Sequence, residues 1–215
     1  MKTPAQWVEI LTECGVSPAV AVRWADSFSA ELLENSFSLG RAEIDDFLAT
    51  ILHESGMLNR LEENLNYASA SLIALFGRHR ISVTECHDYG RNDDHPANQV
   101  KLAEILYGGA WGAKNLGNTE PGDGFKYRGS GLIQVTGRDN FLYLEKLTGL
   151  PLVANPDILR RPGPEALSVA VHFWEGRIPD RVIGDVVATR KAVNGGTLGL
   201  AHFQELTGKL GDALA

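Results

Sequence analysis

The chain has 215 residues, of which 44% are hydrophobic and 22% are charged, and this composition excludes a disordered or fibrous protein. Its net charge is −7 and it has no basic run, which argues against nucleic acid as a partner because phosphate binding needs clustered Lys and Arg. No stretch approaches the roughly 18 apolar residues of a membrane span, so we expect no stable membrane association.

Residues 3–35 predict two helices that serve as scaffold. Thr3 is a suitable N-cap, Pro4 suits the first helical position, and Gly15 follows the expected end of the first helix. Pro18 begins a second apolar helix.

The segment from Phe47 to Tyr67 contains two carboxylates in contrasting settings. An apolar helix with Glu54 in its last turn is expected to end near Gly56. Burial and the partial negative charge of the helix C-terminus should both raise the pKa of Glu54. Glu63 follows among amides and a tyrosine, which suit a wetter place. Such a contrast is what general acid and general base catalysis of glycoside hydrolysis requires.

A structural reading of the same carboxylates stays open at this point. Glutamates at helix ends are often solvated or act as capping residues, and Glu62 next to Glu63 could continue a charged surface.

The following stretch predicts a short helix at Leu72 to Phe76, a polar and weakly patterned segment at 78–94, and a helix that begins at Pro96 and ends at Gly108. The polar segment is rich in residue types that bind metals: His79, Cys86, His87, Asp88, Asp93, Asp94 and His95. Their spacing matches no closed zinc pattern, so we predict no metal site.

Residues 109–131 form a glycine-rich stretch in which aromatic residues alternate with amides. A long loop of this kind inside a compact domain is a functional loop when its neighbours hold it, and this composition favours sugar binding. The stretch has neither a phosphate-loop signature nor a nucleophile elbow, and we expect no cofactor.

The run from Leu132 to Thr136 predicts a short extended piece, after which Thr136 could cap the next helix and Gln134 could be a satisfied core amide. Further helices are expected at 164–174 and 180–193. A last amphipathic helix places four apolar residues on one face: Leu200, Phe203, Leu206 and Leu210. About nine helices in a single domain spanning 1–215 are expected.

The two cysteines, Cys14 and Cys86, lie far apart and form no disulfide framework. They fit a reducing compartment, while a single bridge between them stays open. The N-terminus lacks the long apolar region of a secretory signal, which predicts a product held in the cytoplasm.

With these residues in view, the chain resembles glycoside hydrolase family 19, and in particular the phage and prophage endolysins of that family. The matching motifs are His53-Glu54-Ser55-Gly56, Glu63-Asn64-Leu65-Asn66-Tyr67, Gly117 to Gly124, Tyr127-Arg128-Gly129, Gly131 to Arg138, and Val193-Asn194-Gly195-Gly196. They occur in the family's order and span most of the chain.

The resemblance implies a mainly α, lysozyme-like fold with a small β part and two lobes flanking a substrate cleft. It implies an inverting mechanism in which Glu54 is the general acid, Glu63 is the general base, and the hydroxyl of Thr136 helps to orient the attacking water. It also assigns substrate contacts to Gln134, Asn140, Asn194, Tyr127, Arg128, Asn66 and Tyr67.

Two positions depart from the family pattern. Ser130 stands where many relatives carry arginine, and Phe203 stands near the place of another family arginine. If those arginines hold Glu63 or the acid in position, other side chains must replace them, and the available candidates are Arg128, Arg138 and Arg190.

The function that follows is a peptidoglycan-degrading endolysin that acts on the β-1,4-linked amino sugars of the bacterial wall. It is expected to be a monomer that waits in the host cytoplasm and reaches the periplasm through a separate holin-type pore protein. The alternatives are a chitinase acting on N-acetylglucosamine polymers and, ranked lower, a non-catalytic glycan-binding protein. The last would be expected to have lost one carboxylate, whereas both are present.

Overall fold

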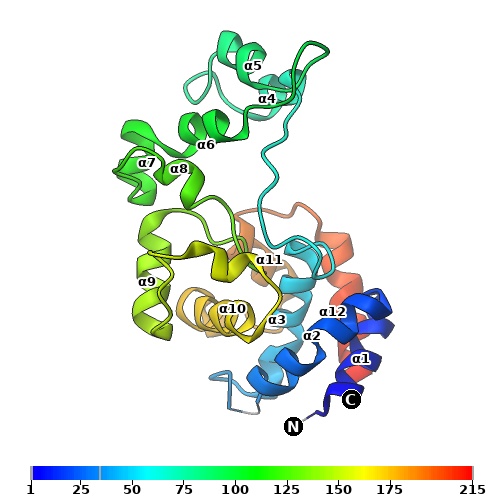
Figure 1. Ribbon diagram of the computed structural model, residues 1–215. Coiled ribbons are helices and arrows are strands. Elements are labelled where there is room, and N and C mark those ends of the chain that lie inside the picture. Colours follow the sequence, from blue (N-terminus) through cyan, green and yellow to red (C-terminus); the bar gives the residue numbers. More distant parts are fainter. Residues whose placement is uncertain (1, 34, 215) are drawn as a thin grey trace.

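The computed structural model describes residues 2–33 and 35–214, and nearly all of the regular structure in them is helical (Figure 1). The α-helices are α1 (Pro4–Glu13), α2 (Pro18–Glu31), α3 (Arg41–Glu54), α4 (Ser69–Leu75), α5 (Val83–Tyr89), α6 (Gln99–Tyr107), α7 (Gly109–Leu116), α8 (Asp123–Lys126), α9 (Arg138–Thr148), α10 (Pro164–Arg177), α11 (Val186–Asn194) and α12 (Leu200–Leu214). Two 3-10 helices, η1 (Pro156–Arg160) and η2 (Asp180–Val182), accompany them. In the described residues the expected β part consists of isolated bridges such as Ser130 with Val135.

The helices form two lobes, each with its own hydrophobic core. The large lobe contains α1, α2, α3, α9, α10, α11 and α12, while the small lobe is built from α4, α5, α6 and α8 around Leu72, Cys86 and Leu106. Figure 1 shows the small lobe at the top, joined to the large lobe by an extended segment in cyan near residue 65. The expected arrangement of two lobes in a mainly α fold is therefore confirmed.

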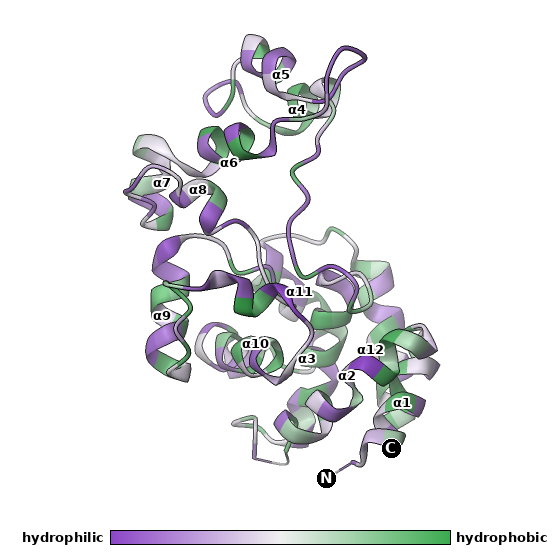
Figure 2. Cartoon of the chain, viewed as in Figure 1, coloured by the Kyte–Doolittle hydropathy of each residue, from purple (hydrophilic) through white to green (hydrophobic). Residues whose placement is uncertain are grey.

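Helix α3 lies at the centre of the large lobe and carries the first candidate carboxylate at its end. Phe47 is fully buried and packs edge-on against Trp174 of α10, with 5.7 Å between ring centroids. Figure 2 shows the hydrophobic residues of α3 and α10 gathered inside this lobe. Because interiors of this kind are packed as densely as organic crystals, α3 provides a rigid base for Glu54.

Two buried carboxylates on α3 have structural partners. Glu43 accepts a hydrogen bond of 2.6 Å from Trp174 Nε1. Asp46 accepts hydrogen bonds from the Gly184 N–H at 2.8 Å and from Thr189 Oγ1 at 3.0 Å. These contacts satisfy both groups and fix α3 to α10 and α11.

The N-terminal helices match their prediction. Thr3 accepts a hydrogen bond from the Gln6 N–H and forms a capping box with that residue, so α1 begins where the sequence indicates. On α2, the indole of Trp24 donates to the Leu58 carbonyl at 3.3 Å. The scaffold thereby supports the turn that follows α3.

Several local predictions were wrong. Helix α5 lies inside the polar, weakly patterned segment at 78–94, for which no helix was predicted; Ser82 and Glu85 form its capping box and Cys86 packs into the core of the small lobe. Helices α7 and α8 lie inside the glycine-rich stretch, and α6 begins at Gln99 rather than at Pro96.

The remaining global expectations concern cysteines, metals and membranes. Cys14 and Cys86 are both free and are buried in different lobes, so the bridge left open by the sequence does not form. Across residues 2–33 and 35–214, no three His, Cys, Asp or Glu side chains gather as metal ligands. Within the same residues, no helix has both the length and the apolar character needed to cross a membrane.

Candidate active site

Glu54 is the last residue of α3, and its carboxylate forms an ion pair with Arg190 of α11. The side chain of Arg190 is only 3% exposed, whereas that of Glu54 is 23% exposed. Arg190 Nε also donates to the Leu198 carbonyl at 2.8 Å, which fixes the plane of the guanidinium. The carboxylate of Glu54 is therefore held by a buried cation while one side of it reaches solvent.

A histidine pair lies beside this carboxylate. His53 Nδ1 is 2.9 Å from Nδ1 of His202 on α12, so only one of the two nitrogens can carry the bridging proton. Burial lowers the pKa of His53, and the charges of Arg190, His202 and Arg60 lower it further, while Glu54 raises it. The pair stays joined while at least one of the two rings is neutral.

The chain turns sharply between the two candidate carboxylates. Ser55 Oγ accepts a hydrogen bond of 2.8 Å from the Leu58 N–H, and Met57 and Leu58 both have positive φ angles, 62° and 64°. Left-handed conformations are uncommon for such residues and persist only where the surroundings impose them.

After this turn, the backbone around Glu63 pairs with the segment at 129–131. The Glu63 N–H donates to the Gly129 carbonyl and the Gly131 N–H donates to the Leu61 carbonyl, both at 2.8 Å. This pairing holds Glu63 against residues 129–131, at the end of the glycine-rich stretch, which we call the wall.

The carboxylate of Glu63 is held from two directions. Tyr107, the last residue of α6, donates its hydroxyl to Glu63 Oε1 at 2.5 Å, and the Gly129 N–H donates to Glu63 Oε2 at 3.1 Å. Sequence reasoning did not identify Tyr107, because no motif connects a residue 44 positions away to the carboxylate.

Gln134, Thr136 and Asn140 lie together at the start of α9. Thr136 Oγ1 donates to the Gln134 carbonyl at 3.1 Å, and Asn140 Nδ2 donates to the Thr136 carbonyl at 2.8 Å. The N-cap of α9 is Gly137, so Thr136 is not the capping residue that its position allowed. Gln134 is half-buried and has a φ of 53°, a left-handed backbone conformation that persists only where the surrounding structure holds it.

Gly129 brings this group next to Glu63. A Cβ atom at Gly129 would lie 2.9 Å from Gln134 Oε1 and 3.3 Å from Glu63 Oε2, which is closer than ordinary contact. The absence of a side chain at this position therefore lets the amide of Gln134 and the carboxylate of Glu63 approach the same point of the wall.

Two of the expected substrate contacts belong to the protein interior instead. Tyr127 is 1% exposed, and its hydroxyl donates to the Val153 carbonyl at 3.0 Å. Arg128 is 8% exposed, forms an ion pair with Glu62 and lies 3.9 Å above the Phe125 ring. Both side chains are occupied by these contacts and are not available to a substrate.

The remaining expected contacts lie on the surface. Asn194 is exposed at the end of α11, where its Oδ1 accepts from the Gly196 N–H at 2.9 Å. Asn66 is also exposed. Tyr67 is half-buried against Phe76, and burial together with the charge of Glu63 raises the pKa of its hydroxyl.

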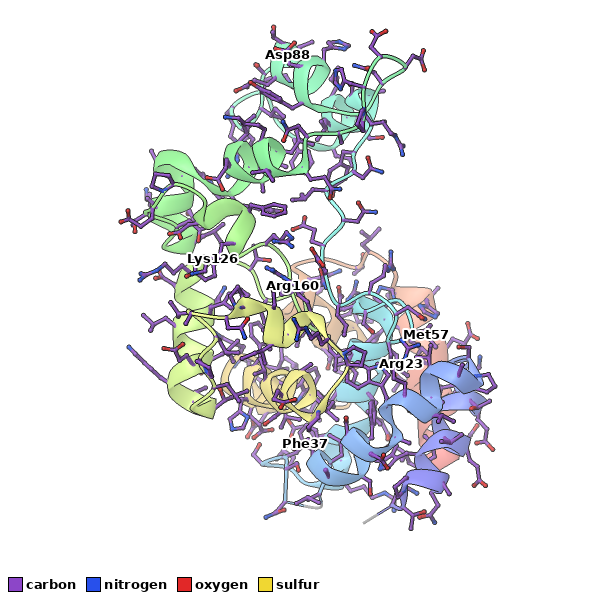
Figure 3. All side chains as sticks on the ribbon, viewed as in Figure 1. Arg23, Phe37, Met57, Asp88, Lys126 and Arg160 are labelled. Carbon is purple, nitrogen blue, oxygen red and sulfur yellow. The ribbon has the colours of Figure 1, made fainter. Side chains whose placement is uncertain are left out.

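The question of the missing arginines has a structural answer. Of the three candidates, Arg190 holds Glu54 and Arg128 holds Glu62, whose side chain stays 49% exposed. Next to the wall, Arg160 Nε donates to Ser130 Oγ at 2.9 Å and its Nη2 donates to the Lys126 carbonyl at 2.6 Å. Figure 3 labels Arg160 and Lys126 near the junction of the two lobes.

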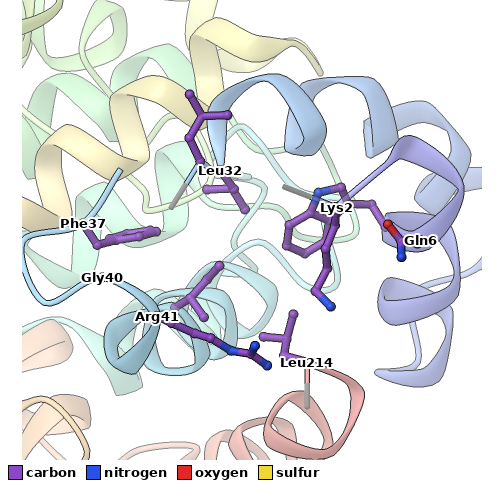
Figure 4. Close-up of a pocket in the computed structure, with 10 residues that line it drawn as sticks. Lys2, Gln6, Leu32, Phe37, Gly40, Arg41 and Leu214 are labelled. Carbon is purple, nitrogen blue, oxygen red and sulfur yellow. The ribbon is translucent and has the colours of Figure 1, made fainter. Parts of the chain in front are cut away.

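A pocket lies away from the two carboxylates, at the end of the large lobe that carries the chain termini (Figures 1 and 4). It has a volume of about 240 Å³, and its lining includes Lys2, Trp7, Phe37 and Arg41. Neither candidate carboxylate lines it.

The helical fold with two lobes, together with two separately held carboxylates, is that of a lysozyme-like glycoside hydrolase. In structure comparison the chain is similar to chitinase C from Streptomyces griseus, with a TM-score of 0.50 and 17% identity over 97% of this chain and 76% of that one. At this identity the likeness supports the fold alone.

Sequence comparison identifies the family. The chain is 32% identical over 157 residues to a glycosyl hydrolase family 19 domain-containing protein of Haemophilus influenzae, which covers 72% of this chain and 71% of that protein. It is also 34% identical to an endochitinase of Arabidopsis thaliana over 73 residues, which cover 34% of this chain and 26% of that protein. A scan of protein-family models finds no match. The chain belongs to glycoside hydrolase family 19 and is an enzyme that acts on glycans.

Proposed function

We propose that this enzyme hydrolyses the β-1,4 bonds between amino sugars of bacterial peptidoglycan, as an endolysin does, by an inverting acid/base mechanism. The observation that carries the proposal is the pair of carboxylates with different supports. Glu54 is held by the buried guanidinium of Arg190 at the end of α3, and Glu63 is held by two neutral donors, the hydroxyl of Tyr107 and the Gly129 N–H. An inverting glycosidase needs two carboxyl groups in distinct roles, separated by enough space for a water molecule.

In this mechanism the protonated form of Glu54 donates its proton to the glycosidic oxygen as the bond to the anomeric carbon breaks, and the carboxylate that is left pairs with Arg190. Glu63 removes a proton from a water molecule that attacks the same carbon from the other face of the sugar. The hydroxyl of Thr136 donates to the protein, so its oxygen keeps a free lone pair that can accept a hydrogen bond from that water.

The amide groups near the carboxylates suit the substrate. Sugar hydroxyls and N-acetyl groups both donate and accept hydrogen bonds, and amide side chains match both roles. Gln134 lies next to Glu63 at Gly129, and Asn140 lies beside Thr136. Asn194, Asn66 and Tyr67 are the remaining proposed contacts.

The second candidate is a chitinase, and the comparisons favour it in one respect, because an endochitinase is among the sequence relatives. Both substrates present β-1,4-linked amino sugars, so the same two carboxylates would serve either reaction. The resemblance of the chain to the endolysin branch of the family is the reason for placing peptidoglycan first. Monomeric state, cytoplasmic location and release through a pore stay predictions from the sequence.

Product analysis tests the substrate. Purified enzyme is incubated with peptidoglycan and, separately, with chitin oligomers, and the products are analysed by mass spectrometry. New muramic acid or glucosamine reducing ends from peptidoglycan support the proposal and identify which bond is cut. Turnover of chitin alone would establish the second candidate instead.

Paired variants test the roles of the carboxylates. Glu54→Gln and Glu63→Gln should each remove most of the activity because the amides keep the shape and lose the proton-transfer function. Glu62→Gln is the matched control on the same segment and should retain activity, since Glu62 contacts Arg128 and not the reacting groups. Full activity in Glu54→Gln would contradict the mechanism.

A further inference from the structure

We propose that Tyr107 is a positioning residue for the general base, through which the small lobe sets the orientation of the Glu63 carboxylate. The inference rests on the proposed function, because it takes Glu63 as the base. It adds a residue that none of the family motifs contains, and it assigns a role in the reaction to the small lobe.

The first argument is geometric. Each oxygen of the Glu63 carboxylate accepts one hydrogen bond from the protein, Oε1 from Tyr107 at 2.5 Å and Oε2 from the Gly129 N–H at 3.1 Å. Two donors on different oxygens fix both the rotation and the tilt of the carboxylate plane. A carboxylate oxygen has about two acceptor positions, so each oxygen retains one for the attacking water.

The second argument is the rigidity of the donor. Tyr107 ends α6, and α6 places Leu102, Ala103 and Leu106 in the core of the small lobe. The other end of α6 also contacts the segment that carries the base, because Gln99 Oε1 accepts a hydrogen bond of 3.2 Å from the Leu65 N–H. The hydroxyl of Tyr107 is therefore delivered by a packed helix that is fixed to this segment at two points.

The third argument is electrostatic. Burial raises the pKa of Tyr107 far above its ordinary value, and the charge of Glu63 and the hydrogen bond to it raise it further, while Arg80 opposes them only in part. The phenol consequently stays protonated and acts as a donor throughout the pH range in which the enzyme can work. A donor of this kind holds a carboxylate in place without competing with it for the proton of the water.

Both lobes therefore contribute a hydrogen-bond donor to the Glu63 carboxylate. Gly129 is followed by Ser130 and Gly131, whose backbones pair with Val135 and Leu61 of the large lobe. Tyr107 belongs to the small lobe. The base is correctly oriented only while the lobes keep this arrangement.

The test is Tyr107→Phe, which removes one oxygen and keeps the ring. It is assayed on whichever glycan the wild-type enzyme cleaves. We expect kcat to fall by about 10- to 100-fold, the order of loss that follows from a misplaced catalytic group, while KM stays within about two-fold because Tyr107 touches the base and not the substrate. Tyr89→Phe, another phenol packed against the small-lobe core, is the matched control and should leave both constants unchanged.

Three results separate this inference from its alternatives. An unchanged kcat in Tyr107→Phe overturns it. A kcat loss accompanied by an equal rise in KM, or by melting of the variant near the assay temperature, shows a structural role and also overturns it. Glu63→Gln is measured in parallel: if that variant stays active, it is the assignment of the base in the proposed function that fails, whatever Tyr107→Phe shows.

Discussion

Replacing Arg190 by Met should destabilise the protein strongly, because it leaves the Glu54 carboxylate without its buried partner. Removing one member of a buried ion pair costs about 3–5 kcal/mol, and the partial exposure of Glu54 reduces this to roughly 2 kcal/mol. The lost hydrogen bond from Nε to the Leu198 carbonyl adds about 1 kcal/mol. Since Met keeps most of the apolar stem, the packing loss is small. The total of about 3 kcal/mol corresponds to a fall in Tm of roughly 6–12 °C for a chain of this length.

Thermal unfolding followed by circular dichroism measures this effect, and the glycan assay follows the accompanying loss of activity. Lys209→Met is the matched control: it removes a cation from the exposed Glu205–Lys209 pair on α12 and should leave Tm unchanged. A fall in Tm of less than about 2 °C in Arg190→Met would refute the reasoning, since it would mean that Glu54 does not depend on this cation.

Two further predictions concern neighbouring groups. Burial, Arg190 and His202 hold the pKa of His53 in the folded state below its ordinary value of 6.5. The stability contributed by neutral His53 is therefore complete above pH 6.5 and is lost as the pH falls below it. Urea titrations from about pH 7.5 to 5 should show this decline in the wild type and a weaker one in His53→Gln. Gly129→Ala should lower kcat and cost about 1 kcal/mol of stability, because the new Cβ meets Gln134 Oε1 at 2.9 Å and Glu63 Cβ at 3.1 Å and displaces both side chains. A fully active variant with an unchanged denaturant midpoint would show that both side chains have room to move.

Local signals were enough to predict much of the fold. The capping residue Thr3, the prolines at the starts of α1 and α2, and the apolar periodicity of α12 act within a few residues of one another, so the sequence shows them directly. Helix α7 was missed because its glycines lower helix propensity, while its packing against α6 and α9 is a tertiary effect.

The sequence predicted both carboxylates but only part of what holds them. Glu54 and Glu63 stand in motifs, and Arg190, which lies 136 positions from Glu54, was one of three candidate arginines between which the sequence does not choose. The partner of Glu63, Tyr107, was not predicted. Glu43 of α3 is buried beside Trp174, which lies 131 positions away in the sequence and donates a hydrogen bond to it. Partners of this kind depend on how helices pack, which the pattern of a single helix does not contain.

The central claim is that Glu54 and Glu63 act as acid and base in a single displacement, and the most direct test is the configuration of the first product. Proton NMR recorded in the first minutes of hydrolysis distinguishes the two anomers before they interconvert. The account predicts that cleavage of the β-linked glycan releases the α-anomer first. Initial release of the β-anomer would contradict it, because retention requires a covalent or substrate-assisted intermediate that this arrangement does not include.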